Sequence, residues 1–224
     1  MSRRLDRLKQ LGCVFVEPLD DIDELEKRYT VNGNPIVVDT PLGSTGLSFD
    51  GVSDGIEADS IFLSEDWTLS IWCKPYDYSL DSNYHHVLSR GSALSELNTN
   101  FAMGFRYREA STNWRVFVMY EDGAGVESLE IILDNGDPKN EWHLLCATFD
   151  YSTPRLELFF DGENLGGSNK AVTPTDGDQP ITIGQPNTIA GQHVRFNGIL
   201  KNAVVLNRVL EDQEIEDIYK GKLI

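Results

Sequence analysis

Residues 141–162 constrain the fold of this chain most, because they hold two apolar strands joined by a short polar turn. Their sequence is EWHLLCATFDYSTPRLELFFDG. Between Trp142 and Phe149 both alternating faces are largely apolar, which predicts a strand covered on both sides. A polar segment containing Pro154 follows, and residues 156–160 then form a second apolar run that ends at an Asp-Gly pair. The sequence therefore predicts a buried β-hairpin.

Short strands separated by Gly, Asn and Asp turns recur along most of the chain. The expected strands are residues 47–49, 56–58, 67–74, 86–90, 100–107, 114–120, 128–132, 142–149, 156–160, 181–184, 194–197 and 203–206. No helical pattern of about 10 to 15 residues separates them, which favours two stacked antiparallel sheets over a parallel sheet with crossover helices. One helix is expected after them, over residues 210–220.

The first 45 residues have a different pattern from the rest. They predict a short helix with Leu5, Leu8 and Leu11 on one face, a strand over 14–16, a helix from Asp20 and a strand over 36–38. Such pieces are too small to build a core of their own, so they must lie on the sandwich or on a partner. We therefore expect an N-terminal arm or extension over residues 1–45 and one domain over residues 46–224.

Several segments outside the hairpin match one known family in the same order. They are Phe-Asp-Gly at 49–51, WTLSIWCKP at 67–75, HVLSRG at 86–91, ITIG at 181–184, FNGI at 196–199 and LNRVL at 206–210. With the hairpin, they resemble laminin-G-like domains of the concanavalin A-like lectin/glucanase superfamily. The resemblance covers roughly residues 46–220 and implies an all-β, two-sheet jelly-roll sandwich. It does not decide function, because this fold carries lectins, adhesion modules, hydrolases and structural domains.

The charge of the chain is unevenly distributed. The total is −17, but residues 1–12 hold four basic residues and one acidic residue, so the remaining residues carry −20. An acidic body argues against nucleic-acid and anionic-membrane partners. The basic residues of the arm are candidates for contact with an acidic protein partner, including a second copy: Arg3, Arg4, Arg7 and Lys9. A solvated helix is the alternative for the same segment.

Cysteine content and the N-terminal sequence bear on location. Cys13, Cys73 and Cys146 are odd in number, and two of them fall in expected strands, where cysteine acts as a small apolar residue. No apolar run of signal-peptide length opens the chain. We therefore expect assembly in a reducing compartment.

The sequence offers little for catalysis. Related retaining glucanases carry a Glu-x-Asp-x-x-Glu strand, because two carboxylates about 5 Å apart act as nucleophile and acid/base. The nearest match, residues 21–26, has Asp at the first position and lies in a helical pattern outside the sandwich. His85 and His86 are adjacent and point to opposite faces of a strand, which does not suit joint metal ligation. We expect no enzyme activity.

The resemblance also implies a calcium site at one rim of the sandwich. Its ligand positions fall on Asp50 and Asp54, but the position of the closing acidic ligand falls on Lys201. An ammonium group there opposes calcium binding, which requires six to eight oxygen ligands. We therefore expect no cofactor, with Asp50 and Asp54 as metal candidates whose alternative role is to form turns.

The loop over residues 75–84 is the best candidate for ligand binding. Sugar recognition uses aromatic faces for stacking and carboxylates or amides for hydroxyl groups. The residues of this loop with those properties are Tyr76, Asp77, Tyr78, Asn83 and Tyr84. The alternative is that the tyrosines pack against the edge of the sandwich. The loop over residues 185–192 could flank the same rim.

These observations favour a non-catalytic binding or structural module that belongs to a larger assembly. We expect a homo-oligomer or a virion component, such as a phage capsid decoration or tail protein. It would be assembled in the host cytoplasm, displayed on the virion surface and anchored by its arm, with a glycan as candidate ligand. Two alternatives remain open: a glycoside hydrolase or lyase on the same fold, and a secreted calcium-dependent lectin or adhesion domain.

Overall fold

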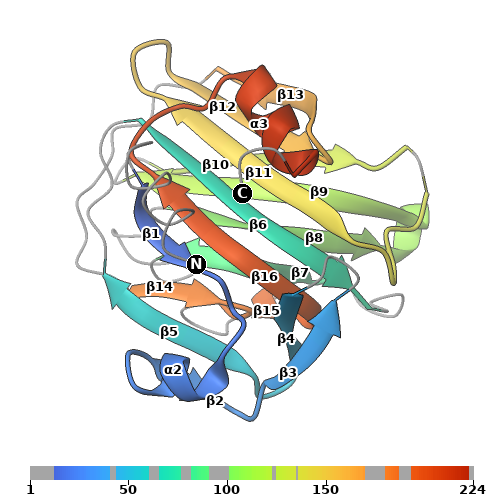
Figure 1. The fold of residues 1–224 in the computed structure, drawn as a ribbon. Helices are drawn as coiled ribbons and strands as arrows, with labels where there is room; N and C mark the ends of the chain where they lie inside the picture. The colour runs from blue at the N-terminus through green and yellow to red at the C-terminus, as the bar shows by residue number, and fades with distance from the viewer. Residues whose placement is uncertain are drawn as a thin grey trace.

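The computed structural model describes residues 13–40, 44–60, 66–76, 82–90, 101–122, 125–134, 136–169, 180–186 and 193–221. Two sheets of eight strands each face one another within these residues (Figure 1). The pairing is antiparallel throughout, except that β15 runs parallel to β7. The predicted two-sheet sandwich of the jelly-roll type is confirmed.

The first sheet has the order β13-β12-β11-β6-β16-β4-β3, and β1 pairs with β16 beside this row. Its strands are β1 (Cys13–Glu17), β3 (Ile36–Thr40), β4 (Ser44–Asp50), β6 (Trp67–Pro75), β11 (His143–Asp150), β12 (Arg155–Phe160), β13 (Glu163–Ser168) and β16 (Asn197–Leu206). The predicted hairpin is β11 and β12, with Phe149 opposite Leu156. Both faces of β11 are buried, as its two apolar faces predict.

The second sheet has the order β10-β9-β8-β7-β14-β5-β2, and β15 pairs with β7. Its strands are β2 (Thr30–Asn32), β5 (Gly55–Ser60), β7 (Tyr84–Arg90), β8 (Phe101–Arg108), β9 (Asn113–Asp122), β10 (Gly125–Ile132), β14 (Pro180–Ile183) and β15 (His193–Arg195). A single 3-10 turn, η1 (Glu109–Ser111), connects β8 to β9.

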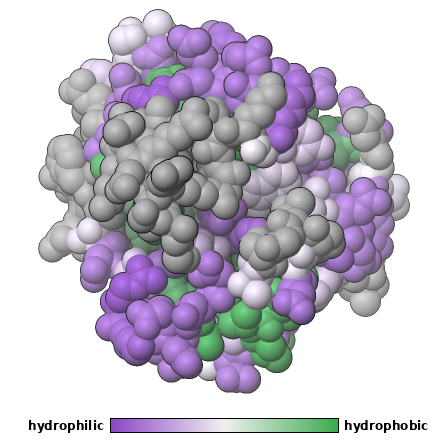
Figure 2. Space-filling view, in the orientation of Figure 1, coloured by the Kyte–Doolittle hydropathy of each residue, from purple (hydrophilic) through white to green (hydrophobic). Residues whose placement is uncertain are grey.

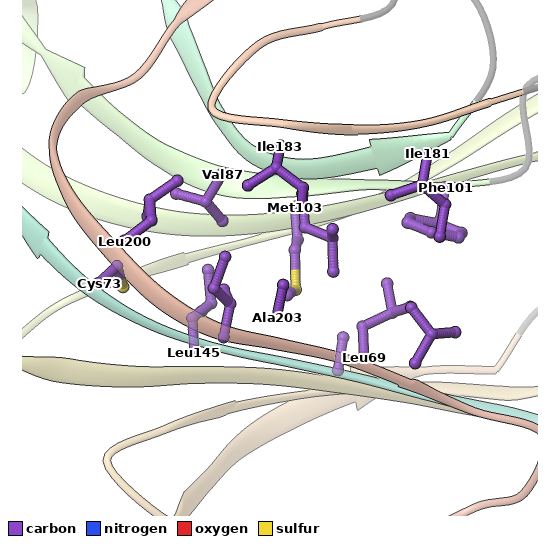
Figure 3. Close-up of a cluster of buried hydrophobic side chains, with 14 of the residues drawn as sticks. Leu69, Cys73, Val87, Phe101, Met103, Leu145, Ile181, Ile183, Leu200 and Ala203 are labelled. Carbon is purple, nitrogen blue, oxygen red and sulfur yellow. The ribbon is translucent and has the colours of Figure 1, made fainter. Parts of the chain in front are cut away.

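Side chains from the facing sheets interdigitate to form the core (Figure 3). Leu69, Cys73, Leu145, Leu200 and Ala203 come from the first sheet, and Val87, Phe101, Met103, Ile181 and Ile183 come from the second. All ten are fully buried. The outer face of each sheet carries its own smaller apolar cluster.

Two short helices complete the described chain. In α2 (Ile22–Glu26), Asp21 caps the N-terminus by accepting a hydrogen bond from the Glu24 amide. The second helix, α3 (Asp212–Tyr219), lies against the outer face of the first sheet and buries Ile215 and Ile218 there (Figure 1). Among the described residues, no helix is long and apolar enough to cross a membrane.

Residues 13–40 are built into both sheets. They supply β1 and β3 to the first sheet and β2 to the second, and they place Phe15, Leu19 and Leu25 in the main core. The predicted boundary between residues 45 and 46 falls inside β4.

Apolar surface gathers near the lower edge of the molecule in Figure 2, over β3, which carries the exposed Ile36.

Candidate functional site

Three arginines converge on one glutamate on the outer face of the second sheet. Arg106 and Arg108 lie two residues apart on β8, so both point away from the core, whose side of the strand is held by Phe105. Arg115 on β9 lies directly opposite Arg106, and Glu130 on β10 lies one strand further along. Neighbouring strands therefore bring together charges that are distant in the sequence.

The carboxylate of Glu130 contacts all three guanidinium groups. Arg106 Nη1 lies 3.2 Å from Oε2, and Arg115 Nη1 lies 3.2 Å from Oε1. Arg108 donates from Nε to Oε1 at 3.2 Å and from Nη2 to Oε2 at 3.4 Å. Three positive charges thus face one negative charge, an excess of two, in a protein whose total charge is −17.

Tyr84, at the start of β7, joins this cluster. The Arg106 guanidinium carbon lies 4.0 Å from the centre of the Tyr84 ring, and Arg106 Nη1 also donates a hydrogen bond to the Tyr84 hydroxyl. The hydroxyl lies 3.3 Å from Glu130 Oε2. Burial and then the negative charge of Glu130 raise the pKa of Tyr84. Phe117 contacts the ring edge at 5.0 Å between centroids, so the tyrosine is fixed on two sides.

The members of the cluster differ in exposure, and this decides which of them can meet a ligand. The side chains of Arg106 and Glu130 are 8% and 14% exposed, whereas Arg108 is 42% exposed and Arg115 is 18% exposed. A further hydrogen bond fixes Arg106, because its Nε donates to the Ser82 carbonyl at 3.0 Å. Arg106 therefore builds the site, Arg108 presents positive charge to solvent, and Arg115 is partly accessible.

Like charges directly opposite each other on paired strands are destabilising, and the Arg106–Arg115 pair is of this kind. Glu130 offsets part of that repulsion. A further carboxylate, sulfate or phosphate would offset the rest, and planar guanidinium groups bind such anions in a bidentate manner. The arrangement is thus suited to an anionic ligand.

The predicted ligand residues fall partly on this site. Tyr84 is a member of the cluster, and Asn83 precedes it in the chain. Tyr76 lies at the end of β6 in the other sheet, where its amide donates to the Asn197 carbonyl at 3.0 Å. Asp77 and Tyr78 lie outside the described residues. The ligand-binding role of all five stays a prediction.

Sequence reasoning missed the other members of the cluster, which are Arg106, Arg108, Arg115 and Glu130. One signal was available: Arg106 lies on the predicted strand 100–107 and Arg108 follows its end, two residues on, which places both on one face if the strand continues. The convergence on Glu130 depends on the pairing of three strands, and no local pattern encodes that pairing.

The metal candidates Asp50 and Asp54 form a tight turn after β4. Asp50 Oδ1 accepts hydrogen bonds from the amides of residues 52, 53 and 54 at 2.8, 2.8 and 2.9 Å. Asp54 is buried and accepts from the Asn34 amide at 2.7 Å and the Asp50 amide at 2.9 Å. Both carboxylates therefore hold backbone in the way that turn-forming aspartates do.

The remaining position of the implied calcium site is held by a lysine. Lys201, at the position of the closing acidic ligand, is 5% exposed within β16. Among the described residues, no group of three or more His, Cys, Asp or Glu side chains is arranged to hold a metal ion. The metal role of Asp50 and Asp54 stays a prediction. The predicted partner-binding residues Arg3, Arg4, Arg7 and Lys9 lie outside the described residues.

A groove of about 530 Å³ lies at the opposite edge of the sandwich from β2 and β3. The end of β10 and the following loop form one wall, and the β12–β13 hairpin forms the other. Five carboxylates line it: Asp134, Asp137, Glu141, Asp161 and Glu163. This chemistry calls for a test of catalysis, because glycoside hydrolysis needs a carboxylate pair.

The carboxylates of this groove are poorly placed for acid/base work. Asp161 is the one among them that is partly buried, and both its oxygens accept hydrogen bonds. Oδ2 lies 2.8 Å from His143 Nδ1, and Oδ1 accepts from the Leu144 amide at 2.9 Å. The other His143 nitrogen, Nε2, lies 3.2 Å from the Pro138 carbonyl. Asp161 thus fixes the start of β11, and the remaining four acids face solvent.

Comparison with family models gives one match. The model described as the concanavalin A-like lectin/glucanases superfamily, Laminin_G_3, matches residues 50–216, about three quarters of the chain. A search of curated protein sequences found no match.

Solved structures with the same fold include several binding domains of toxins. The binding domain of Paraclostridial Mosquitocidal Protein 1 is 14% identical with a TM-score of 0.68, over 94% of this chain and 52% of that one. The receptor-binding domain of botulinum neurotoxin type G is 14% identical with a TM-score of 0.63, over 87% and 46%. A third structure is of botulinum neurotoxin type C, whose cell entry is described as dependent on two ganglioside molecules. It is also 14% identical with a TM-score of 0.63, over 87% of this chain and 46% of that one. The chain spans about half the length of these structures, and the likeness establishes the fold.

Proposed function

This chain belongs to the Laminin_G_3 family of the concanavalin A-like lectin/glucanases superfamily, and on that premise we propose that it is a non-catalytic module that binds negatively charged glycans. One observation carries the proposal: three arginines surround a single glutamate beside Tyr84 on an otherwise acidic protein. The excess positive charge selects ligands that bear a carboxylate or sulfate group over neutral sugars.

The residues of the cluster have two different roles, contact with the ligand and support of the residues that make this contact. Arg108, which is 42% exposed, and the partly accessible Arg115 would donate to the anionic group of the sugar. Arg106, Tyr84 and Glu130 are held in contact with one another, and Glu130 keeps the guanidinium groups of Arg108 and Arg115 in place. Asn83, next to Tyr84, supplies an amide within the same segment for sugar hydroxyl groups.

The comparisons support a binding role. Two of the matching structures are named as binding or receptor-binding domains, and the type C neurotoxin is described as entering cells through interaction with ganglioside molecules. The binding of those proteins is a property of longer chains, so a glycan ligand for this chain rests on its own arginine cluster.

A binding experiment with a charged and a neutral sugar tests the proposal. We expect sialyllactose, which carries one carboxylate, to bind in isothermal titration calorimetry, and lactose to bind at least about tenfold more weakly. Replacing Arg108 or Arg115 with alanine should weaken sialyllactose binding by about tenfold, because charge-assisted hydrogen bonds contribute roughly 1.5–3 kcal/mol. Binding should also weaken as salt is added.

Arg155 provides a matched control. It is 46% exposed on β12, in the other sheet, and pairs with Glu157 at 2.8 Å. The Arg155→Ala variant should bind sialyllactose as the unchanged protein does. Equal binding of both sugars, or equal loss in all three variants, would contradict the assignment.

The setting that we propose is a virion surface, with assembly in the host cytoplasm and anchoring through the basic N-terminal residues. Cys73 and Cys146 support assembly in a reducing compartment, because they are buried free thiols. Protein partners in a shell or tail, including further copies of this chain, would complete the assembly. Antibody labelling of purified particles tests this setting, and particles that carry no label on their surface would refute it.

Hydrolysis is the second candidate, because the groove beside β13 is lined by carboxylates. Incubation of the purified protein with β-glucans and sialylated glycans, followed by chromatography of the sugars, distinguishes the two functions. We expect no release of sugar, since both oxygens of the half-buried Asp161 are already hydrogen-bonded. Turnover that disappears in a Glu163→Gln variant would establish an enzyme instead.

A further inference from the structure

The groove between β10 and β13 has a floor and a rim of different chemistry. Side chains of the two strands and of Phe160 form the apolar part: Ile131, Leu133, Phe160 and Leu165. Carboxylates surround it, and none of its described lining residues is Lys or Arg. Asp161 lies against His143 and Asp137 pairs with Lys139 at 2.9 Å, whereas the carboxylates of Glu141 and Glu163 are exposed. The groove thus suits a segment that is both apolar and basic.

The groove lies where the outer strands of the two sheets come together. Among the described residues, β10 ends one sheet and β13 ends the other. The groove is lined by the last residues of β10 and the first residues of β13, so a bound segment would meet side chains from both sheets.

Residues 1–12 of this chain have the complementary chemistry. Their sequence, MSRRLDRLKQLG, combines three leucines with four basic residues against one acidic residue. The leucines recur every three residues, so a helical segment presents them on one face, with Arg7 and Lys9 on its two flanks. Leucines would cover the apolar floor while guanidinium groups meet the carboxylates of the rim.

The strand order separates this segment from the groove of its own molecule. β1, which begins at Cys13, lies five strand spacings from β13, through β16, β6, β11 and β12. At about 4.8 Å per spacing this is roughly 24 Å. A twelve-residue helix is only about 18 Å long. A segment that is helical, as its leucine spacing predicts, is shorter than this distance, which favours its entry into the groove of another molecule.

We propose that the groove between β10 and β13 binds residues 1–12 of a second copy of this chain. Each copy offers one basic segment and one acidic groove, so the contact is head to tail and can close a ring or extend an array. The partner is thus specified by charge complementarity within a single sequence.

A charge-swap experiment on the full-length protein tests this contact. The first variant, Arg3→Glu/Arg4→Glu/Arg7→Glu, reverses the segment, and the second, Glu141→Lys/Glu163→Lys, reverses the rim of the groove. In sedimentation velocity, we expect the unchanged protein to self-associate, and more weakly as salt is added. Each variant alone should lose self-association by about tenfold or more, and an equimolar mixture of the two should form a complex.

The control has the same change of charge at a distant place. Glu57 and Asp59 are exposed on β5, at the other end of the second sheet, and Glu57→Lys/Asp59→Lys should associate as the unchanged protein does. Circular dichroism melts establish that each variant is folded, and the milder Glu141→Gln/Glu163→Gln variant replaces any that is not.

Three results of the charge-swap experiment would overturn the proposal. They are an unchanged protein that stays monomeric at every concentration, a groove variant that associates like the control, and a mixture of the two reversed variants that forms no complex. A crosslink between Lys9 and the groove within one chain of a monomer would place the segment in its own molecule, which also refutes the contact between copies.

Discussion

The buried carboxylate of Asp54 holds the turn that follows β4. The residue is 4% exposed and its two oxygens accept hydrogen bonds from the amides of Asn34 and Asp50. Replacement with alanine leaves two amide donors without partners, so we expect the free energy of unfolding to fall by about 2–4 kcal/mol. Urea denaturation measures this change. Asp59→Ala, at an exposed position, should change stability by less than about 0.5 kcal/mol, and equal effects would contradict the role of Asp54.

Asp50 in the same turn makes stability depend on pH. Partial burial acts to raise its pKa, but amide donors from residues 54, 52 and 53 outweigh burial and hold the pKa well below its ordinary value. A carboxyl whose pKa is lower in the folded state stabilises above its unfolded pKa, and this contribution is lost as pH falls through the folded pKa. The stability difference between the unchanged protein and Asp50→Asn should therefore shrink from about pH 5 downward. A constant difference across that range would contradict it.

The residues of the arginine cluster mark how far sequence reasoning reaches. Tyr84 was identified because its chemistry is visible in a polar, aromatic loop. Its partners lie 22 residues away at Arg106 and 46 residues away at Glu130. Their role follows from the side-by-side position of β7, β8, β9 and β10, which requires the whole sheet to be known.

At the scale of elements, strands with strong apolar alternation were predicted and a glycine-rich strand was missed. β11 and β12 follow their sequence closely, because each has apolar residues at every core position. The sequence of β13 contains Gly166 and Gly167 and has little intrinsic strand propensity. Pairing with β12 imposes its extended conformation, after a turn in which Asp161 and Gly162 have φ of 54° and 83°.

The C-terminal helix illustrates the same balance between local signals and packing. It was expected over residues 210–220 and spans Asp212–Tyr219, because Glu211 and Glu214 form a capping box and Arg208 binds Glu214 through two hydrogen bonds of 2.8 and 2.7 Å. The start of a helix is thus set by polar contacts that a periodic apolar pattern does not locate.

Packing of α3 on the first sheet gives a test at this scale. Ile215 is fully buried in the outer apolar cluster, where Leu144 and Leu206 also lie. Ile215→Ala should lower the free energy of unfolding by about 2–5 kcal/mol, because it leaves a cavity between helix and sheet. Gln213→Ala, on the exposed side of the same helix, should cost less than about 0.5 kcal/mol in urea denaturation. A small effect of Ile215→Ala would mean that the helix does not contribute to the stable fold.

At the scale of the whole molecule, the first described residues join the two sheets. β1 and β2 lie in different sheets although twelve residues separate the end of one from the start of the other, and α2 between them buries Leu25 in the main core. A segment of this kind cannot unfold without exposing core residues of both layers. The predicted division at residues 45 and 46 places this whole segment outside the main domain. The structure therefore predicts that residues 13–40 unfold together with the sandwich, whereas the division predicts that they unfold separately.

Leu25→Ala distinguishes them. Leu25 is fully buried, and its truncation should lower the free energy of unfolding by about 2–5 kcal/mol. Tryptophan fluorescence includes the signal of Trp67 in the core, and far-ultraviolet circular dichroism follows the secondary structure. If residues 13–40 belong to the cooperative unit, the unfolding transitions measured by the two methods will shift together to lower urea concentration. If they form a separate extension, the variant will show an early transition by circular dichroism alone, with fluorescence unchanged. We expect the first result, because Leu25 lies in the same apolar cluster as Trp67.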